Sequence, residues 1–110
     1  MRTKDITNEY VEFITEHSPD ETLLRQLAEE CMELGQACLK MIRANNKNEY
    51  VKKSYDDIYN NLVEEFGDVR NCMNVVESKL GLSHVDIYSR RLQKLERWRE
   101  RLLLLEKHEE

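Results

Sequence analysis

Apolar residues recur at spacings of three and four along most of the chain, which is the periodicity of amphipathic α-helices. Between residues 60 and 76, these apolar positions are Leu62, Phe66, Val69, Met73 and Val76. Successive residues of a helix are about 100° apart, so these five side chains share one face. Three glycines and one proline are too few for the many turns of a β-fold. The pattern therefore predicts an all-α fold.

The same periodicity, together with start and stop signals, predicts four main helices in a bundle. The predicted helices cover residues 5–16, 19–43, 54–80 and 83–105, followed by a fraying tail "EKHEE". Ser18, followed by Pro19 and Glu21, predicts the start of the second helix through a capping box. Ser54 and Ser83 are further N-cap signals. The segment "ANNKNEY" is predicted to be a loop, and residues 49–53 are ambiguous.

The first predicted helix is short, and its apolar side consists of Ile6, Tyr10, Phe13 and Ile14. Gly81 is a natural stop for the third helix. With 110 residues, the chain is expected to form a single domain, residues 1–110, with a small core. The second helix is apolar over about half of its circumference. We therefore expect dimerisation to complete the bundle.

Two acidic pairs lie on the two longest predicted helices. They are Glu30 with Glu33 and Glu65 with Asp68. Glu65 and Asp68 point into the apolar side of their helix, whereas Glu30 lies at the edge of the apolar arc of its helix and Glu33 one step outside it. A spacing of three places both carboxylates of a pair on nearly the same helix face. If the two helices pack together, four carboxylates converge, and hard cations such as Mg²⁺ favour this kind of oxygen-rich site.

A solvated acidic rim is the alternative interpretation of these pairs. The chain has 22 acidic residues, and the same spacing also occurs at Glu9/Glu12 and Glu106/Glu109. The spacing alone is therefore weak evidence, and the position of each pair on its helix carries more weight. A di-iron bundle would need a histidine three residues after a glutamate, and the sequence contains no such pair.

A row of basic residues runs along the last predicted helix beside its apolar stripe. The basic row consists of Arg90, Lys94, Arg97 and Arg101. The apolar stripe consists of Tyr88, Leu92, Leu95, Trp98 and Leu102. We expect Glu96 and Glu100 on the opposite side. An unbroken basic row suits phosphate binding, whereas a solvated face with packed aliphatic stems is the alternative.

Composition excludes several classes of protein. The net charge of −5 argues against a general binder of nucleic-acid polymers. No apolar run approaches the ~20 residues of a membrane span, and the first residues contain no apolar signal-peptide core. Cys31, Cys38 and Cys72 lie in helical patterns without the paired spacing of a zinc site. They are expected to be small buried thiols in a reducing, cytoplasmic setting.

The two acidic pairs resemble the paired motif of the MazG-like all-α nucleoside triphosphate pyrophosphohydrolases. That motif is Glu-Glu-x-x-Glu on one helix and Glu-x-x-Asp on the next. Here the corresponding stretches are "EECME" (Glu29, Glu30, Glu33) and "EEFGD" (Glu65, Asp68). The resemblance covers about residues 22–102, and the paired motif is much more specific than either half.

The resemblance implies Mg²⁺-dependent hydrolysis between the α- and β-phosphates of a nucleoside triphosphate, with Mn²⁺ as a substitute ion. The products would be a nucleoside monophosphate and pyrophosphate, as in house-cleaning of the nucleotide pool. Carried onto this chain, Glu30, Glu33, Glu65 and Asp68 would be the catalytic, metal-binding residues. The family also commonly builds its bundle from two chains, which implies a homodimer or a dimer of dimers.

Family members often carry a Lys, an Asn and an Arg on the following helix. Lys94 and Arg101 match the outer positions, and Arg97 and Arg90 extend this phosphate-binding row. Trp98 stands where Asn is common, so the substrate choice stays open. Two alternatives remain, namely an enzyme like phosphoribosyl-ATP pyrophosphohydrolase and a non-catalytic helical dimerisation or regulatory module.

Overall fold

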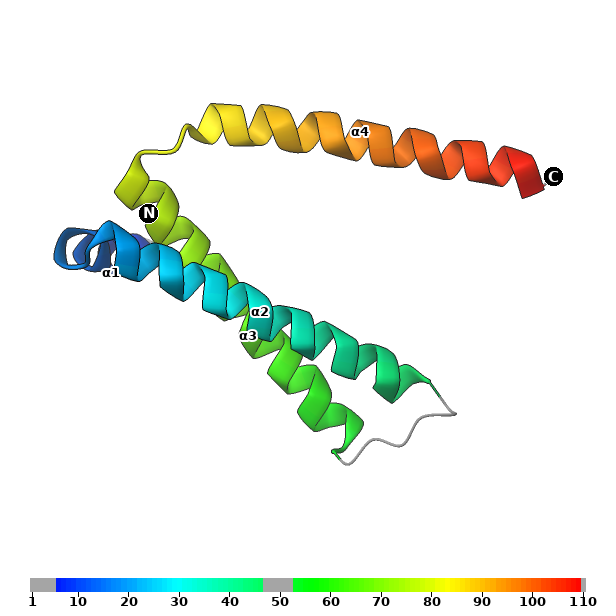
Figure 1. The fold of residues 1–110 in the computed structure, drawn as a ribbon, viewed down its shortest axis with the longest axis horizontal. Coiled ribbons are helices and arrows are strands. Elements are labelled where there is room, and N and C mark those ends of the chain that lie inside the picture. Colours follow the sequence, from blue (N-terminus) through cyan, green and yellow to red (C-terminus); the bar gives the residue numbers. More distant parts are fainter. Residues whose placement is uncertain (1–5, 47–52, 110) are drawn as a thin grey trace, which may run out of the picture. The chain divides into compact units, whose positions relative to one another are not determined.

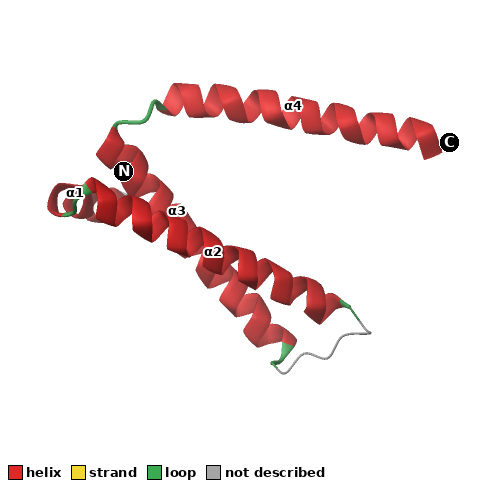
Figure 2. Ribbon diagram, in the orientation of Figure 1, coloured by secondary structure: helices red, strands yellow, loops and turns green. Residues whose placement is uncertain are grey.

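Four α-helices make up nearly all of the described chain. The computed structural model describes residues 6–46 and 53–109. The helices are α1 (Ile6–His17), α2 (Asp20–Asn45), α3 (Tyr55–Leu80) and α4 (His84–Glu109) (Figures 1 and 2). Neither of the two described stretches contains a β-strand. The predicted all-α class with four main helices is therefore confirmed.

The helices belong to two compact units. Helices α1, α2 and α3 form one unit within residues 1–80, and α4 belongs to a second unit within residues 81–110. In the first unit, α2 and α3 pack along each other and α1 packs against α3. Lys79 near the end of α3 lies 3.8 Å from Asp20 at the start of α2, measured from Nζ to Oδ1. Helices α2 and α3 therefore form an antiparallel hairpin.

The contact between α2 and α3 is a continuous seam with alternating spacings of four and three residues. We define the seam on α2 as Leu23, Leu27, Glu30, Leu34, Ala37, Met41 and Ala44. On α3 it consists of Ile58, Leu62, Glu65, Val69, Cys72, Val76 and Lys79. Every seam residue is buried or half-buried, and every other described residue of α2 is exposed. This spacing is that of a left-handed coiled coil.

The first unit has its apolar core at the end where all three helices meet. Leu23, Val75 and Val76 are buried together there, and Val11 and Leu27 pack against them. Since Val75 precedes the seam residue Val76, it points to the side of α3 on which α1 lies. The core is small because α1 has only 12 residues.

Helix α1 turns a different face to the hairpin from the one predicted. Tyr10, Phe13 and Ile14 are exposed, whereas Val11 and Thr15 are half-buried. Val11 and Thr15 are one turn apart, so a narrow strip of α1 meets the hairpin. The ring of Phe13 instead stacks on His17, with ring centroids 4.0 Å apart. The predicted buried face of α1 was wrong, because its larger apolar residues lie outside this strip.

Two of the three predicted N-caps are confirmed. The backbone N–H of Asp57 donates to Ser54 Oγ at 3.3 Å, and that of Asp86 donates to Ser83 Oγ at 3.1 Å. These bonds satisfy donors that a helix start leaves unpaired. Gly81 has φ = +62°, the left-handed conformation that ends a helix and that glycine adopts without steric cost.

Other predicted boundaries need correction. Pro19, not Ser18, is the N-cap of α2, and its side chain makes no capping hydrogen bond. Helix α2 also continues through Asn45 into the predicted loop, and residues 47–52, including most of the ambiguous stretch, lie outside the described residues. Helix α4 extends to Glu109 rather than fraying at the tail. The tail contains no helix breaker, and basic residues in its last turn favour the helix dipole.

Helix α4 is exposed along its whole described length apart from the half-buried Ile87. Its predicted apolar stripe, which includes Leu95 and Trp98, is thus open. Within the described residues, no helix combines the length and apolarity required to cross a membrane.

The seam predicts that truncating an apolar seam residue lowers the free energy of unfolding more than truncating an exposed apolar residue. Val76→Ala should lower the free energy of unfolding by about 2 kcal/mol, because it removes buried methyl groups and leaves a cavity. Met32→Ala is the control, since Met32 is 64% exposed on α2. Chemical denaturation monitored by circular dichroism measures both. Equal losses in the two variants would contradict the assignment of the seam.

Candidate functional site

Two glutamates occupy seam positions that would otherwise hold apolar residues. Glu30 on α2 and Glu65 on α3 are both half-buried. Glu33 and Asp68 each come one residue before a seam residue, so they lie on one side of the hairpin, with Glu33 exposed and Asp68 half-buried. The four predicted acidic residues thus lie on two packed helices.

Three of these carboxylates converge. One oxygen from each of Glu30, Glu33 and Glu65 can be chosen so that all three lie within 4.8 Å of one another. Asp68 does not belong to this trio, although it lies near enough to affect the ionisation of Glu30 and Glu65. The helical hairpin therefore brings together three of the four acids as a cluster and places the fourth beside them.

Hydrogen bonding leaves the cluster partly unsatisfied. Gln26 Nε2 donates to Glu30 Oε1 at 2.8 Å. The other oxygens, Glu30 Oε2 and Glu65 Oε2, are buried and have no hydrogen-bond partner among the described residues. A buried polar atom without a partner is unfavourable. Glu30 and Glu65 both belong to the all-carboxylate cluster with Glu33, and oxygen ligands are the chemistry that hard divalent cations prefer.

The electrostatics of the cluster oppose ionisation. Burial is the main cause that raises the pKa of Glu30, and repulsion from Glu33 and Asp68 raises it further. The pKa of Glu65 is raised by burial, then by repulsion from Glu33, Asp68 and Glu64, while Lys40 has a smaller, opposite effect. Both shifts have the expected sign for carboxylates that lose water and gain like-charged neighbours.

Cys72 is a seam residue beside the acids. Burial is the first cause that raises the pKa of its thiol, and the charges of Glu30 and Asp68 follow. The raised pKa keeps this thiol neutral. All three cysteines are free, but Cys31 and Cys38 are exposed rather than buried as predicted. Both side chains point away from the seam. Helical periodicity alone could not predict this, because the position of α3 decides which part of the apolar arc of α2 is buried.

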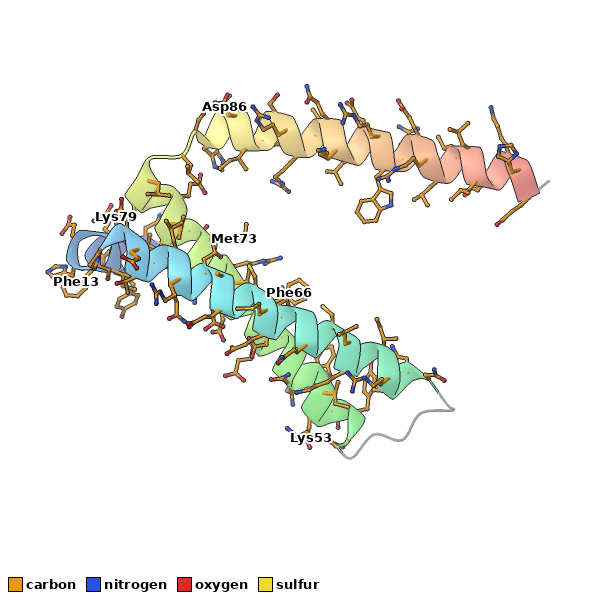
Figure 3. The ribbon with its side chains drawn as sticks, in the orientation of Figure 1. Phe13, Lys53, Phe66, Met73, Lys79 and Asp86 are labelled. Carbon is orange, nitrogen blue, oxygen red and sulfur yellow. The ribbon has the colours of Figure 1, made fainter. Side chains whose placement is uncertain are left out.

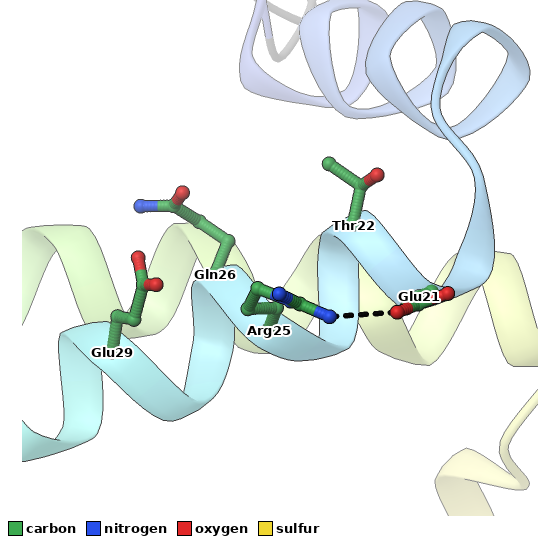
Figure 4. A pocket seen from close by; sticks show the side chains of 5 residues that line it. All are labelled: Glu21, Thr22, Arg25, Gln26 and Glu29. Carbon is green, nitrogen blue, oxygen red and sulfur yellow. Dashed lines mark hydrogen bonds and ion pairs between the residues drawn. The ribbon is translucent and has the colours of Figure 1, made fainter.

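Sequence reasoning missed three contributors to this site, namely Gln26, Lys40 and Cys72. Gln26 lies four residues before Glu30, and Lys40 lies seven after Glu33, so helical spacing carried a signal for both. Gln26 also lines a shallow hollow near the start of α2 (Figure 4). In this hollow Arg25 Nη2 donates to Glu21 Oε1 at 2.6 Å.

The predicted phosphate-binding residues lie on α4, in the second unit. Arg90 and Lys94 line one hollow beside Trp98, together with Ile87, Arg91 and Leu95. Lys94, Arg97 and Arg101 line a second hollow, again beside Trp98, together with Glu100 and Leu104. Glu100 therefore shares a hollow with the basic residues instead of lying opposite them as predicted.

Comparison of the chain with known protein families, with curated proteins and with solved structures found no match. The resemblance to the MazG-like enzymes therefore rests on the paired acidic motif and the residues around it.

The raised pKa values predict that Glu65 destabilises the fold when it is ionised. This penalty is absent well below the ordinary value of 4.5, grows as the pH rises through that value, and is complete above the raised folded-state pKa. Glu65→Gln should therefore raise the melting temperature at pH 7 by a few degrees and lose this advantage near pH 3.

The control for this experiment is Glu16→Gln, because Glu16 is exposed on α1. It should change the melting temperature little at either pH. Thermal unfolding of both variants and the parent, without added divalent metal, measures the effect. A gain for Glu65→Gln that is the same at pH 3 and pH 7 would contradict the electrostatic origin.

Proposed function

We propose that this chain is a Mg²⁺-dependent nucleoside triphosphate pyrophosphohydrolase of the MazG-like type. The observation that supports this proposal best is the pair of buried, partnerless oxygens, Glu30 Oε2 and Glu65 Oε2, within a cluster of three glutamates. Nothing in the hairpin seam requires two acids at these positions, since apolar residues fill most of the seam. A ligand with positive charge gives both atoms a role.

The donor set favours a hard cation. Glu30, Glu33 and Glu65 would hold the ion. Asp68, whose charge acts on Glu30, would complete the set or orient a bound water. Carboxylate oxygens suit Mg²⁺ and Mn²⁺, whereas zinc sites normally use sulfur or imidazole ligands. Binding of a cation would also favour the ionised forms of Glu30 and Glu65 and so reverse the upward shift of their pKa values.

The proposed reaction is the attack of water on the α-phosphorus of a nucleoside triphosphate. The bond between the α-phosphorus and the oxygen that bridges it to the β-phosphate breaks, and this oxygen leaves with the pyrophosphate. The products are a nucleoside monophosphate and pyrophosphate. A bound divalent ion supplies activation of water and neutralisation of phosphate charge. If Asp68 does not bind the ion, its carboxylate can act as the general base that accepts a proton from the attacking water.

The basic row of α4 is the proposed phosphate-binding element of the second unit. Arg90, Lys94, Arg97 and Arg101 are exposed and carry unit positive charges that suit phosphate oxygens. Trp98 lies between the hollows that these residues line, so its indole ring is a candidate surface for stacking on a base. Members of the family commonly carry an Asn at this position, so the tryptophan leaves the preferred base open. A panel of nucleoside triphosphates identifies that base.

A non-catalytic helical module is the second candidate function. The observation in its favour is the open apolar stripe of α4, which includes Leu92, Leu95 and Leu102. Exposed apolar stripes of this kind mark contacts with other proteins. An enzyme like phosphoribosyl-ATP pyrophosphohydrolase differs only in substrate, so phosphoribosyl-ATP belongs in the substrate panel.

The proposal predicts release of pyrophosphate from at least one nucleoside triphosphate in the presence of Mg²⁺, with loss of activity on chelation. Glu65→Gln should lower turnover at least 100-fold, as expected for loss of a group that holds a catalytic ion. Mg²⁺ should raise the melting temperature of the parent by mass action, but hardly that of the variant. Glu16→Gln serves as the control and should behave as the parent in both measurements.

Several outcomes would count against this function. Release of orthophosphate alone would show that a different bond is cut. Mg²⁺ stabilisation without turnover on any member of the panel would favour the non-catalytic module. Near-parental turnover of Glu65→Gln would remove Glu65 from the site.

A second prediction concerns phosphate binding by α4. Lys94→Ala and Arg101→Ala should each raise KM about tenfold, because each removes one charge-assisted contact to phosphate. Arg99→Ala is the control, since Arg99 lies on the same helix but lines neither hollow beside Trp98. Steady-state kinetics measures all three variants. Equal changes in KM for Arg99→Ala and Lys94→Ala would indicate a general charge effect rather than a binding row.

A further inference from the structure

One side of the α2–α3 hairpin carries the two outer acids, and we call it the acidic side. Glu33 on α2 and Asp68 on α3 each come one residue before a seam residue. A step of one residue turns a side chain by about 100° around its helix. Because the helices are antiparallel and their seams face each other, a step back from the seam leads to the same side on both helices. The acidic side therefore consists of the residues that precede seam residues.

Toward the tip of the hairpin, where α2 ends and α3 begins, the acidic side changes from carboxylates to hydrogen-bond donors. Lys40 and Asn61 each precede a seam residue. Lys40 comes seven residues after Glu33, and Asn61 comes seven residues before Asp68. Seven residues are nearly two helical turns, so each donor lies about 10 Å from its acid along the helix and on nearly the same face. In an antiparallel hairpin both of these steps lead toward the tip.

The register of the hairpin places the two donors at nearly the same level. Asp20 on α2 contacts Lys79 on α3, which is labelled in Figure 3. Lys40 lies twenty residues after Asp20, and Asn61 lies eighteen residues before Lys79. Both helices rise by the same distance per residue, so Lys40 and Asn61 come to lie across the hairpin from each other. The helices are still packed there, because Ile58 is only 3% exposed.

The charge of Lys40 reaches the acidic cluster. Lys40 is exposed, and no carboxylate of residues 6–46 and 53–80 forms a salt bridge with it. Cα–Cβ bonds in a helix tilt toward its N-terminus, so the Lys40 side chain leans back along α2 toward the acids. Its positive charge lowers the pKa of Glu65, against the rise caused by burial and by neighbouring carboxylates. Lys40 is therefore an available cation beside the cluster.

Asn61 is an available donor on the other helix. Its side chain is half-buried, and its amide has no hydrogen bond within residues 6–46 and 53–80. Such an amide can donate to a ligand without first breaking an internal hydrogen bond. Arg43 also precedes a seam residue nearer the tip, but Asp57 on α3 lies at its level with the opposite charge. Lys40 and Asn61 are thus the pair on the acidic side that is best placed to receive an anion.

We propose that Lys40 and Asn61 bind the phosphate groups of the substrate that extend beyond the phosphate held at the acidic cluster. This inference rests on the proposed function, because a cation at Glu30, Glu33 and Glu65 is what holds the first phosphate. An ammonium and an amide both donate to phosphate oxygens, and the ammonium also neutralises charge. The hairpin then binds the ion and the phosphate chain within the first unit.

Binding of inorganic tripolyphosphate in the presence of Mg²⁺, measured by isothermal titration calorimetry, tests this subsite without a nucleotide. Lys40→Gln should raise the dissociation constant about tenfold, because it removes one charge-assisted contact. Asn61→Ala should raise it about threefold, as expected for a neutral hydrogen bond. Lys40→Arg keeps the charge and should stay close to the parent. Circular dichroism verifies that all variants remain helical.

Binding of Mg²⁺ alone separates a ligand contact from a structural role. Lys40→Gln removes a positive charge near Glu65, so it should leave the affinity for Mg²⁺ unchanged or raise it. The same variant should bind tripolyphosphate more weakly. Weakening of both ligands to the same extent would overturn the proposal, because Lys40 would then only maintain the cluster.

Arg70→Gln is the matched control for charge. Arg70 is exposed on α3 and follows the seam residue Val69, so it lies on the opposite side of the hairpin near the level of the acids. This variant removes the same charge as Lys40→Gln and should bind tripolyphosphate like the parent. Equal weakening in the two variants would indicate a general charge effect and overturn the subsite.

Steady-state kinetics distinguishes failure of the subsite from failure of the proposed function. Lys40→Gln should raise KM for a nucleoside triphosphate about tenfold with little change in kcat. An unchanged KM in an active variant would refute the subsite alone, as would a parent that does not bind tripolyphosphate with Mg²⁺. Tripolyphosphate binding that depends on Lys40, in a parent that hydrolyses no nucleoside triphosphate, would support the subsite and refute the proposed hydrolysis.

Discussion

The seam between α2 and α3 is the interaction on which the first unit depends. Its residues alternate at spacings of four and three, so each helix presents one narrow row to the other over its full length. Most seam positions are apolar and contribute by burial. Glu30 and Glu65 break this pattern in the middle of the seam, where both are half-buried and their carboxylates approach each other and Glu33. The stabilising apolar contacts must therefore outweigh an internal electrostatic cost.

That cost gives the hairpin its chemical character. Two carboxylate oxygens are buried without hydrogen-bond partners, and the pKa values of Glu30 and Glu65 are raised mainly by loss of water. Gln26 and Lys40 relieve only part of the charge. A protein that used the seam only for stability would gain by replacing both acids with apolar side chains. Their presence is the physical basis for the proposed cation site and for the proposed activity.

The hairpin also separates two kinds of surface. Residues before the seam positions include Glu33 and Asp68 on the acidic side, whereas the residues after the seam positions are mostly apolar, apart from Asn45, Arg70 and Glu77. The antiparallel arrangement makes this separation possible, because it turns equivalent steps on both helices to the same side. Helix α4 likewise carries two kinds of surface, because a basic row and an apolar stripe run along this one exposed helix.

The sequence by itself determined the number and type of helices and the ends set by local chemistry. Ser54 and Ser83 cap their helices, and Gly81 adopts positive φ, because these features depend on a few neighbouring atoms. Periodicity also placed Glu30, Glu65 and Asp68 on or at the edge of the packed side, where all three are half-buried. It could not distinguish seam from open face, since Leu62 and Phe66 share one apolar arc but only Leu62 faces α2. Only the tertiary structure decided that distinction. It also decided that Val11 rather than Phe13 of α1 packs against the core, and that Glu30 converges with Glu65. Each of these features depends on where a second helix lies.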